Sequence, residues 1–502
     1  MAETQVDVVV IGGGIAGLSA AAHLAEAGKR VVLFEQHDKP GGYYTSFVRR
    51  GIIFDITAHW TVAPADVNKM LADLNAPGID FVHHPFIGQY FGPDSKHGIW
   101  LGNDRERFVR SIMHAYPSAS RDSIDTLIDL SLKVEAEIAG AHFASPELMS
   151  PLGKIGMLVQ VPLKLRRVMK YGSMPAEELL TSLFPGDALA GLRAAMYMLA
   201  PIKDFNAIGI LLYIGFALRG KAYQPRGGAI AAAQAFAEAA HHNGAQLRCG
   251  ETVTQILVED RRVRGVVLQS GEVVKADCVV SAADIRQTFF NLMDRNLVPA
   301  EYQVKLETTP ISSTFVIVSL VVDAKPADFG FEHMDAFYTD TADIAQALTP
   351  DDPARSLVSI QFPEFRDETA DLSHYGVQLV ALASFDFREQ WASGDGHART
   401  ESYRAMKEKI AAELIARAEK YWPGLRDHIV EMDIATPLTM HAYTRNDQGA
   451  SVGWSYTSKE RWTQRVPFVE GLYLAGHWVG PSGVYNVAKS GKNAAELILK
   501  GR

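Results

Sequence analysis

The sequence has little of what marks disulfide-stapled, nucleic-acid-binding or membrane-spanning proteins. Its 502 residues include two cysteines, Cys249 and Cys278, which excludes a disulfide framework and a cysteine-rich metal site, so we expect a reducing compartment and no bound metal. The net charge is -9 without a long run of one sign, so the basic stripe typical of nucleic-acid-binding proteins is missing. The longest apolar run beyond the N-terminal segment, residues 207–218, is shorter than a spanning helix, which needs about 20 residues. These absences predict a cytoplasmic protein with no nucleic-acid partner.

Apolar residues, by contrast, make up 47% of the chain, which is long enough for two or three domains. Residues 8–22 are nearly all apolar or glycine, as in a signal sequence. The residues before them carry two acids and no lysine or arginine, whereas a signal peptide begins with a basic region. The glycine spacing gives this segment a different interpretation.

The N-terminal segment carries the complete pattern of a dinucleotide-binding unit. A short apolar run precedes Gly12, Gly14 and Gly17 in G-x-G-x-x-G spacing, a helical pattern follows, and a second apolar run, residues 31–34, ends in Glu35. The first glycine permits a tight turn, the second lets a pyrophosphate approach the backbone, and the third lets helix and strand pack closely. Glu35 is placed to accept hydrogen bonds from ribose hydroxyls, which favours FAD or NAD over NADP.

Further segments extend this pattern along the chain. The pair Gly41–Gly42 precedes a predicted strand, and the pair Gly227–Gly228 precedes an alanine-rich predicted helix. Residues 251–284 predict three short strands followed by a buried strand, and residues 471–476 predict one more buried strand.

Together these segments resemble the phytoene desaturase, carotene isomerase and retinol saturase group of FAD-dependent oxidoreductases, within the wider amine-oxidase-like flavoprotein superfamily. The resemblance implies an α/β fold in which a Rossmann-type FAD-binding domain is interleaved with an α+β substrate-binding or cap domain. The FAD-binding domain would comprise residues 1–70, 220–290 and 455–502, and the cap domain residues 71–219 and 291–454. The matching stretches are VVVIGGGIAGLSAAAHLAEAGKRVVLFE, GGYYTSFVRRGIIFD, YQPRGGAIAAAQAFAE, TVTQILVEDRRVRGVVLQSGEVVKADCVVSAAD and GLYLAGHWVGPSGVYNVAKSGKNAAELI.

The same resemblance implies FAD as the cofactor and suggests which residues hold it. The backbone of Val253 would bind the adenine, and Gly41 and Gly42 would lie along the ribityl chain or the flavin edge. The expected cofactor-binding residues are Gly12, Gly14, Ile15, Ala16, Gly17, Glu35, Gln36, Gly41, Gly42, Tyr43, Tyr44, Val253, Ala282, Gly476, His477, Gly483 and Val484.

The sequence departs from the family pattern at two places that should face the flavin. Thr57 stands where the family has glycine in its F-D-x-G motif. Residues 481–486, PSGVYN, replace a glycine-rich Pro-Gly turn. We expect the final helix to start there, at Val484, with its positive N-terminal end against the flavin. Because both departures lie at the reacting end, the substrate and the direction of the reaction stay open.

Histidine and tyrosine side chains near these segments are the candidates for catalysis. His59 and His477 are candidates because histidine titrates near neutral pH, the alternative for each being a purely structural hydrogen bond. Tyr485 is the third candidate. Tyr43, Tyr44, Trp60 and Tyr485 are expected to line the flavin face and stack on a substrate, or else to pack in the core.

Three functions fit the sequence. The first is oxidation, reduction or cis–trans isomerisation of carbon–carbon bonds in a long apolar polyene or isoprenoid lipid, with an external electron acceptor or donor because a second dinucleotide fingerprint is absent from the sequence. The second is a flavin amine oxidase acting on another small molecule. The third is a non-catalytic prenyl- or lipid-binding relative of the same fold, which the intact glycine pattern disfavours.

One cap segment suggests a membrane contact. Residues 148–176 contain no acid but five basic residues, Lys154, Lys164, Arg166, Arg167 and Lys170, interspersed with apolar ones. Such a segment suits peripheral docking on anionic lipid, the alternative being a cap helix packed on its own protein with a solvated basic edge.

Overall fold

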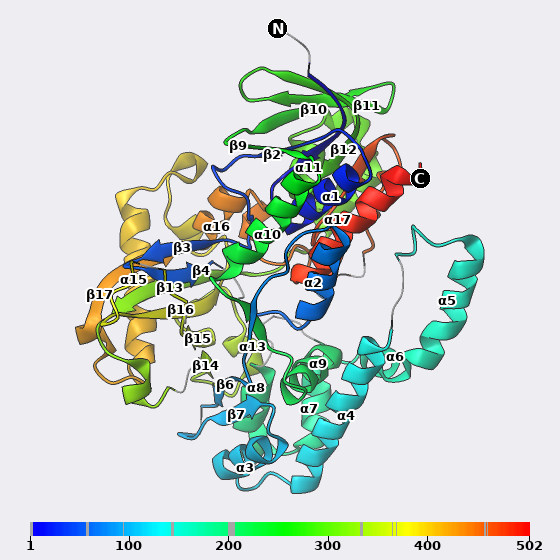
Figure 1. Cartoon of the computed structure of the whole chain (residues 1–502). Coiled ribbons are helices and arrows are strands. Elements are labelled where there is room, and N and C mark those ends of the chain that lie inside the picture. The colour runs from blue at the N-terminus through cyan, green and yellow to red at the C-terminus, as the bar shows by residue number, and fades with distance from the viewer. Residues whose placement is uncertain are drawn as a thin grey trace.

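The computed structural model describes residues 4–56, 60–93, 95–141, 145–198, 206–331, 335–363, 365–367, 369–455, 458 and 460–501. Two seven-stranded sheets lie at different heights of the molecule, and a helical region adjoins the second one (Figure 1). The arrangement confirms the predicted α/β class, with a Rossmann-like sheet and a second, mixed sheet.

The first sheet has the order β10-β11-β12-β1-β2-β9, and β18 pairs with β12. β1 runs parallel to both β2 and β12, whereas β10, β11 and β12 form an antiparallel meander. These strands come from the three sequence segments expected for the FAD-binding domain, although the exact domain boundaries stay a prediction. The strands are β1 (Thr4–Ile11), β2 (Val31–Glu35), β9 (Gln246–Cys249), β10 (Val253–Glu259), β11 (Arg262–Leu268), β12 (Val273–Ser281) and β18 (Leu472–Leu474).

The apolar runs of β1 and β2 are explained by burial on both faces of this sheet. Val8 and Val10 pack with the helices on one side, and Val9 and Ile11 pack on the other side. A strand covered on both faces needs apolar residues at every position rather than at alternate ones. The helices of the first side are α1 (Ile15–Glu26), α10 (Ala229–His242) and α17 (Val484–Leu499).

The second sheet has the order β17-β13-β16-β15-β14-β6-β7. All its pairs are antiparallel except β14 with β6. The long helix α15 (Glu401–Ala418) covers one face and contributes Ile410, Leu414 and Ile415 to the core there. The strands are β6 (Phe86–Phe91), β7 (Ile99–Gly102), β13 (Thr314–Val322), β14 (Asp335–Tyr338), β15 (Val358–Gln361), β16 (Tyr375–Ala383) and β17 (Ile429–Ala435).

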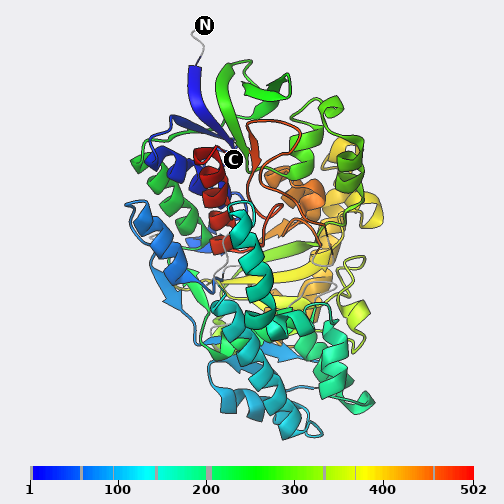
Figure 2. The same cartoon turned by 90° about the vertical axis from the view of Figure 1, so that its right-hand side faces the viewer.

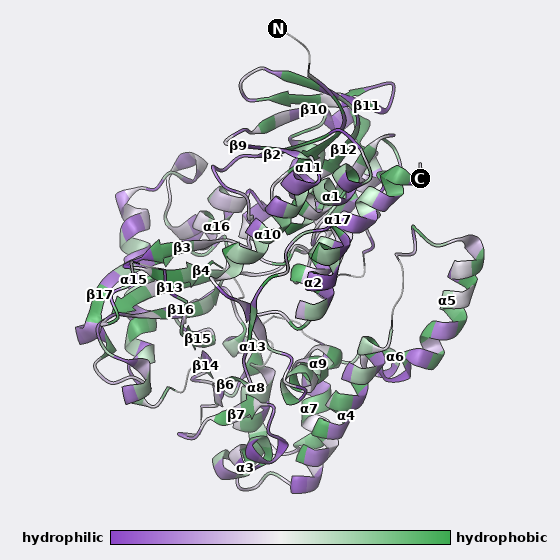
Figure 3. Cartoon of the chain, in the orientation of Figure 1, coloured by the Kyte–Doolittle hydropathy of each residue, from purple (hydrophilic) through white to green (hydrophobic). Residues whose placement is uncertain are grey.

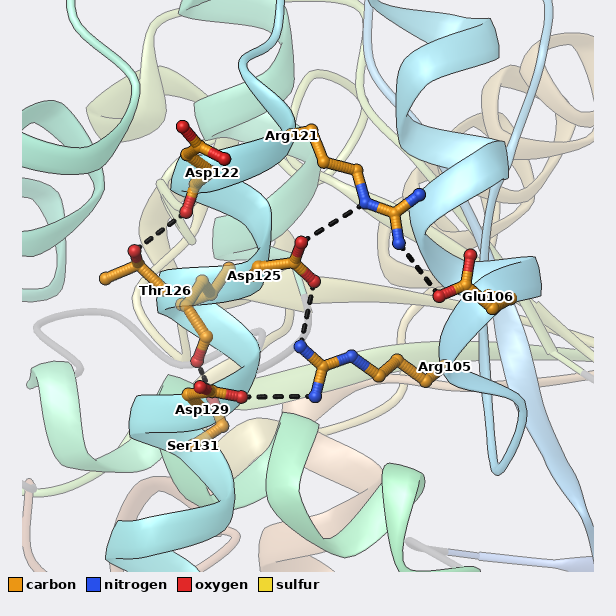
Figure 4. Close-up of polar contacts among 9 residues, drawn as sticks. Arg105, Glu106, Arg121, Asp122, Asp125, Thr126, Asp129 and Ser131 are labelled. Carbon is orange, nitrogen blue, oxygen red and sulfur yellow. Dashed lines mark hydrogen bonds and ion pairs between the residues drawn. The ribbon is translucent and has the colours of Figure 1, made fainter.

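Helices α3, α4 and α6 to α9 pack around their own apolar core at the lower end of Figure 1, whereas α5 has no buried residue and lies outside this core. On its surface, Arg105 forms ion pairs with Asp125 (2.8 Å) and Asp129 (3.1 Å), and Arg121 pairs with Asp125 and Glu106 (Figure 4). Exposed pairs of this kind contribute little each, so the network mainly orients α3 against α4. The helices are α3 (Arg105–Ala115), α4 (Arg121–Ala139), α5 (Pro151–Lys164), α6 (Arg166–Tyr171), α7 (Ala176–Leu183), α8 (Ala190–Tyr197) and α9 (Ala207–Leu218).

Two small hairpin-like sheets and six shorter helices complete the described chain. In the part of the chain that the structure describes, each helix is too short or too polar to cross a membrane. The remaining elements are β3 (Ser46–Arg49), β4 (Ile52–Asp55), β5 (Phe81–His83), β8 (Tyr223–Pro225), α2 (Pro64–Asp73), α11 (Ile285–Phe290), α12 (Ala300–Thr308), α13 (Ile344–Ala347), α14 (Arg388–Trp391) and α16 (Pro437–Thr444).

Candidate functional site

A single cavity of about 640 Å³ is lined by residues of both large sheets. Helices α1 and α17 both begin at its wall, where Ile15 and Val484 line it. Cavities of roughly 300–1,000 Å³ are usual for small-molecule sites, and this one brings together segments from the whole length of the chain. It therefore joins the predicted nucleotide site to the second sheet.

Glu35 sits at the end of β2 and is held by the backbone around it. Its Oε2 accepts a hydrogen bond from the N–H of Gly13 (2.7 Å), and its Oε1 accepts one from the N–H of His37 (2.9 Å). The carboxylate is buried yet lines the cavity, so its remaining lone pairs can accept from ribose hydroxyls.

Gly14 and Gly17 have different surroundings in the glycine turn. A Cβ on Gly17 would lie 2.0 Å from the carbonyl oxygen of Gly12, so this position allows no side chain beneath the turn. A Cβ on Gly14 would meet only Gly42 Cα at 4.0 Å, so the space above Gly14 is open to the cavity. That open space at the N-terminus of α1 fits a pyrophosphate group, which such a turn binds through its backbone N–H groups.

The structure brings almost all the expected cofactor-binding residues to this cavity. Gly17 is the exception, because it packs helix against turn and does not line the cavity. The expected residues that line it are Gly12, Gly14, Ile15, Ala16, Glu35, Gln36, Gly41, Gly42, Tyr43, Tyr44, Val253, Ala282, Gly476, His477, Gly483 and Val484. Their assignment to FAD itself stays a proposal.

Tyr443 covers the nucleotide end from the other side of the cavity, as expected for a segment near the pocket, and its contact with His37 is one that the sequence does not predict. Its carbonyl oxygen accepts hydrogen bonds from Gln36 Nε2 (2.9 Å) and His37 Nε2 (2.8 Å), and its ring stacks on that of His37 at 4.1 Å. These residues are more than 400 positions apart, so local sequence pattern carries no signal for the pair.

His477 faces the cavity, and its Nε2 has no hydrogen-bond partner among the described residues. Desolvation lowers the pKa of His477 to about 4, so the ring is neutral at pH 7. This is a correction to the expectation of a histidine titrating near neutral pH. A neutral ring can offer Nε2 as a donor or an acceptor to a bound group, according to its tautomer.

Tyr43 lies beside His477, with ring centroids 6.3 Å apart. Its hydroxyl donates to the carbonyl oxygens of Gly449 (3.0 Å) and Ala450 (2.9 Å), and burial raises its pKa to about 12. Tyr43 therefore stays protonated and holds the segment after α16 in place rather than acting as a proton donor.

The other two catalytic candidates are placed differently. Tyr485 is partly buried but does not line the cavity, and Lys489 lies over its ring at 5.9 Å. Residue i+1 of a helix points about 100° away from residue i, so Tyr485 turns aside where Val484 faces the cavity. His59 and Thr57 lie outside the described residues. Trp60 and Tyr44 both line the cavity, and their position at the flavin face stays a prediction.

The second sheet forms a wall of the same cavity that combines apolar side chains with four polar ones. Along β16, Val377, Leu379 and Ala381 belong to the core under α15, whereas Val380 and Leu382 line the cavity. The same alternation holds in the neighbouring strands because successive side chains of a strand point to opposite faces. The sheet residues that line the cavity are Phe315, Ile317, Asp335, Phe337, Ser359, Gln361, Gln378, Val380 and Leu382.

Several polar side chains have structural partners at this wall. Asp55 Oδ1 accepts from Ser46 Oγ (2.6 Å) and from the N–H of Ala229 (2.8 Å), which ties the β3–β4 pair to the start of α10. Gln378 Nε2 donates to the Asp55 carbonyl oxygen (3.1 Å). These contacts give Asp55 a structural role.

Two buried carboxylates near the cavity were not foreseen. Lys221 lines the cavity and pairs with the buried Glu135 at 2.5 Å. Asp284 lines it too, and burial raises the pKa of Asp284 to about 6 although it accepts N–H bonds from Gln287 (2.9 Å) and Asp447 (2.8 Å). Among the described residues there is no cluster of side chains suited to a metal ion.

Comparison with known proteins agrees with this geometry. Residues 10–74 match the model of an NAD(P)-binding Rossmann-like domain, and residues 207–496 match that of the FAD dependent oxidoreductases. The chain is 25% identical to prolycopene isomerase 1 of an Oncidium hybrid over 98% of this chain and 84% of that protein. It is 23% identical to all-trans-retinol 13,14-reductase of Danio rerio over 89% of this chain and 77% of that protein. A solved structure of a putrescine oxidase double mutant has the same fold, with a TM-score of 0.64, 15% identity, and coverage of 99% of this chain and 100% of that one.

Proposed function

We propose, since the chain belongs to the family of FAD dependent oxidoreductases, that it changes carbon–carbon bonds of a long apolar polyene or isoprenoid lipid. The change is a desaturation, a saturation or a cis–trans isomerisation. The observation that supports this substrate is the apolar wall of the second sheet, which opens into the same cavity as the nucleotide-binding turn. The names of the related isomerase and reductase point to the same chemical class.

The residues of the chain would bind the cofactor and shape the site around it. Glu35 and the turn at Gly14 would hold the ribose and pyrophosphate of FAD, which supplies or accepts hydride when bound. His477 would present its unpartnered Nε2 as a neutral hydrogen-bonding group, and the apolar side chains of β13 and β16 would exclude water.

The test is anaerobic incubation of the FAD-loaded protein with a panel of saturated and polyunsaturated isoprenoid lipids. Bleaching of the flavin absorbance by a saturated lipid would establish desaturation, and reoxidation of the reduced flavin by a polyene would establish saturation. New geometric isomers without net flavin change would establish isomerisation. A flavin spectrum and lipid profile unchanged by every lipid would overturn the proposal.

A second candidate, amine oxidation, is favoured by one observation. Asp335 is an acidic side chain on the apolar wall of the cavity, and a carboxylate can bind an ammonium group. Release of hydrogen peroxide in air with amines, but no response to lipids, would select this alternative.

A further inference from the structure

Helix α5 exposes an apolar surface that faces away from the rest of the protein. None of its 14 residues is buried, and Leu152, Leu158 and Leu163 are 81%, 70% and 77% exposed. Ile155 and Val159 are also exposed, and Leu152, Ile155, Val159 and Leu163 follow one another at spacings of three and four residues, which places them on one face of the helix. Figure 1 shows α5 standing clear of the main body, and Figure 2 shows it facing the viewer.

Residues on either side of this helix hold both of its ends against the rest of the protein. Before it, the carboxylate of Glu147 accepts hydrogen bonds from the backbone N–H groups of Gln464 (2.9 Å) and Arg465 (3.2 Å). After it, Arg167 of α6 forms an ion pair of 2.8 Å with the mostly buried Glu137 of α4. The helix itself starts at an N-cap, where Ser150 Oγ accepts from Gly153 N (3.1 Å). The exposed face therefore belongs to an anchored helix rather than to a loose tail.

The charge around this face has one sign. Residues 148–176 contain no acid, and Arg167 alone among the five basic residues has a carboxylate partner among the described residues. The side chains of Lys154, Lys164 and Arg166 are exposed, as is that of Lys170, whose Nζ also lies over the Tyr171 ring at 5.0 Å. Figure 3 shows that the ribbon of α5 carries both hydrophobic and hydrophilic residues. Two copies of this face would bring like charges together, which disfavours self-association, whereas an anionic lipid surface complements both the charge and the apolar side chains.

We propose that α5 and α6 dock the protein on an anionic lipid bilayer, with the apolar face formed by Leu152, Ile155, Val159 and Leu163 in the headgroup–acyl boundary and the lysines at the headgroups. The docked segment adjoins the cavity, because α6 packs on α4 and α9, and α9 supplies Tyr213 and Phe216 to the cavity lining. On the proposed function, an apolar substrate would then reach the cavity from the bilayer. The docking itself does not depend on that function.

Vesicle flotation of the full FAD-loaded protein tests the docking without any activity measurement. The wild type should float with vesicles of 30% phosphatidylglycerol in phosphatidylcholine, less with pure phosphatidylcholine, and less in 0.5 M salt. Replacing Leu152, Leu158 and Leu163 by glutamine should reduce partitioning at least about tenfold, and K154Q/K164Q should reduce it about fivefold per charge, as expected for basic residues near an anionic surface.

The matched control is Leu372→Gln, since Leu372 is 78% exposed on another part of the surface and should leave partitioning unchanged. Far-UV circular dichroism and bound FAD verify that each variant is folded. Absence of flotation by the wild type, or wild-type flotation by the triple leucine variant, would overturn the proposal. If the wild type is a dimer that does not bind vesicles, and the triple leucine variant is a monomer, the face instead binds a second copy of the chain. If the wild type floats with the vesicles but its flavin spectrum and the lipid profile do not change with any lipid, the proposed function is refuted and the docking proposal stands.

Discussion

Glu35 accepts a hydrogen bond of 2.7 Å from the backbone N–H of Gly13, so the carboxylate at the end of β2 is locked to the glycine turn. A second bond from the His37 N–H occupies its other oxygen. The carboxylate is therefore fixed in orientation by the protein itself. On its proposed role at the ribose, its replacement should reduce cofactor affinity as well as local order.

Replacing Glu35 by glutamine should weaken FAD binding about 10- to 100-fold, because the amide keeps one acceptor and turns its NH2 toward a backbone donor. Titration of the FAD-free protein with FAD, followed by flavin fluorescence, measures the change. Glu26→Gln, at an exposed position near the end of α1, is the control and should bind normally. Unchanged affinity of the Glu35 variant would mean that the ribose lies elsewhere.

Gly14 and Gly17 should respond to alanine in opposite ways. Gly17→Ala places a methyl group 2.0 Å from a backbone oxygen and should destabilise the protein by about 3 kcal/mol or more. Gly14→Ala meets open space and should change the unfolding free energy by less than about 1 kcal/mol, yet reduce FAD affinity at least about tenfold. Urea unfolding and FAD titration of both variants separate the two effects. Normal FAD binding by Gly14→Ala would contradict the placement of the pyrophosphate.

His477 should make stability depend on pH. Its pKa of about 4 in the folded protein lies below the ordinary value of 6.5, so the unfolded chain binds the proton first. The unfolding free energy should therefore fall as the pH drops from about 6.5 toward 4, by up to about 3 kcal/mol. Urea unfolding at pH 7 and pH 5 measures this fall in the unfolding free energy, and the fall should be smaller in His477→Gln than in the wild type. His242→Gln, exposed at the end of α10, should keep the wild-type profile; identical profiles for both variants would show that His477 is not the group responsible.

Filling the cavity should block substrate without displacing the cofactor. Val380→Trp adds bulk to the apolar wall and should lower turnover of a long polyene at least about tenfold while FAD content stays the same. Val430→Trp, on the exposed side of β17, is the control. Full turnover by Val380→Trp would show that the substrate does not bind against the second sheet.

The first sheet was predictable because its signals are local. Gly12 to Glu35 lie within one strand–turn–helix–strand unit, and each residue type is required by backbone geometry at its own position. The cavity-lining residues of the second sheet could not be predicted from the sequence. β13 and β16 are apolar at nearly every position, since one face packs on α15 and the other lines an apolar cavity, so the alternation that marks a functional face is lost.

The remaining site residues depend on contacts that no local pattern encodes. Tyr443 meets His37 across the cavity, and Lys221 meets Glu135 across the helical region. Sequence reasoning also assigned His477 an ordinary pKa, because burial of a ring is known only after the fold is. Tyr485 lies one helical step from Val484, which does line the cavity, and the sequence alone does not distinguish the two orientations.

The alternation in β16 separates two kinds of evolutionary constraint within one strand. Leu379 and Ala381 hold the sheet against α15, and a change there threatens the fold. Val380 and Leu382, between and beside them, line the cavity, and Leu382 also packs in the apolar core of the helical region. Selection for a different substrate can therefore act on Val380 without disturbing the contacts of its neighbours with α15, and a laboratory library at that position would vary the cavity while leaving this core intact.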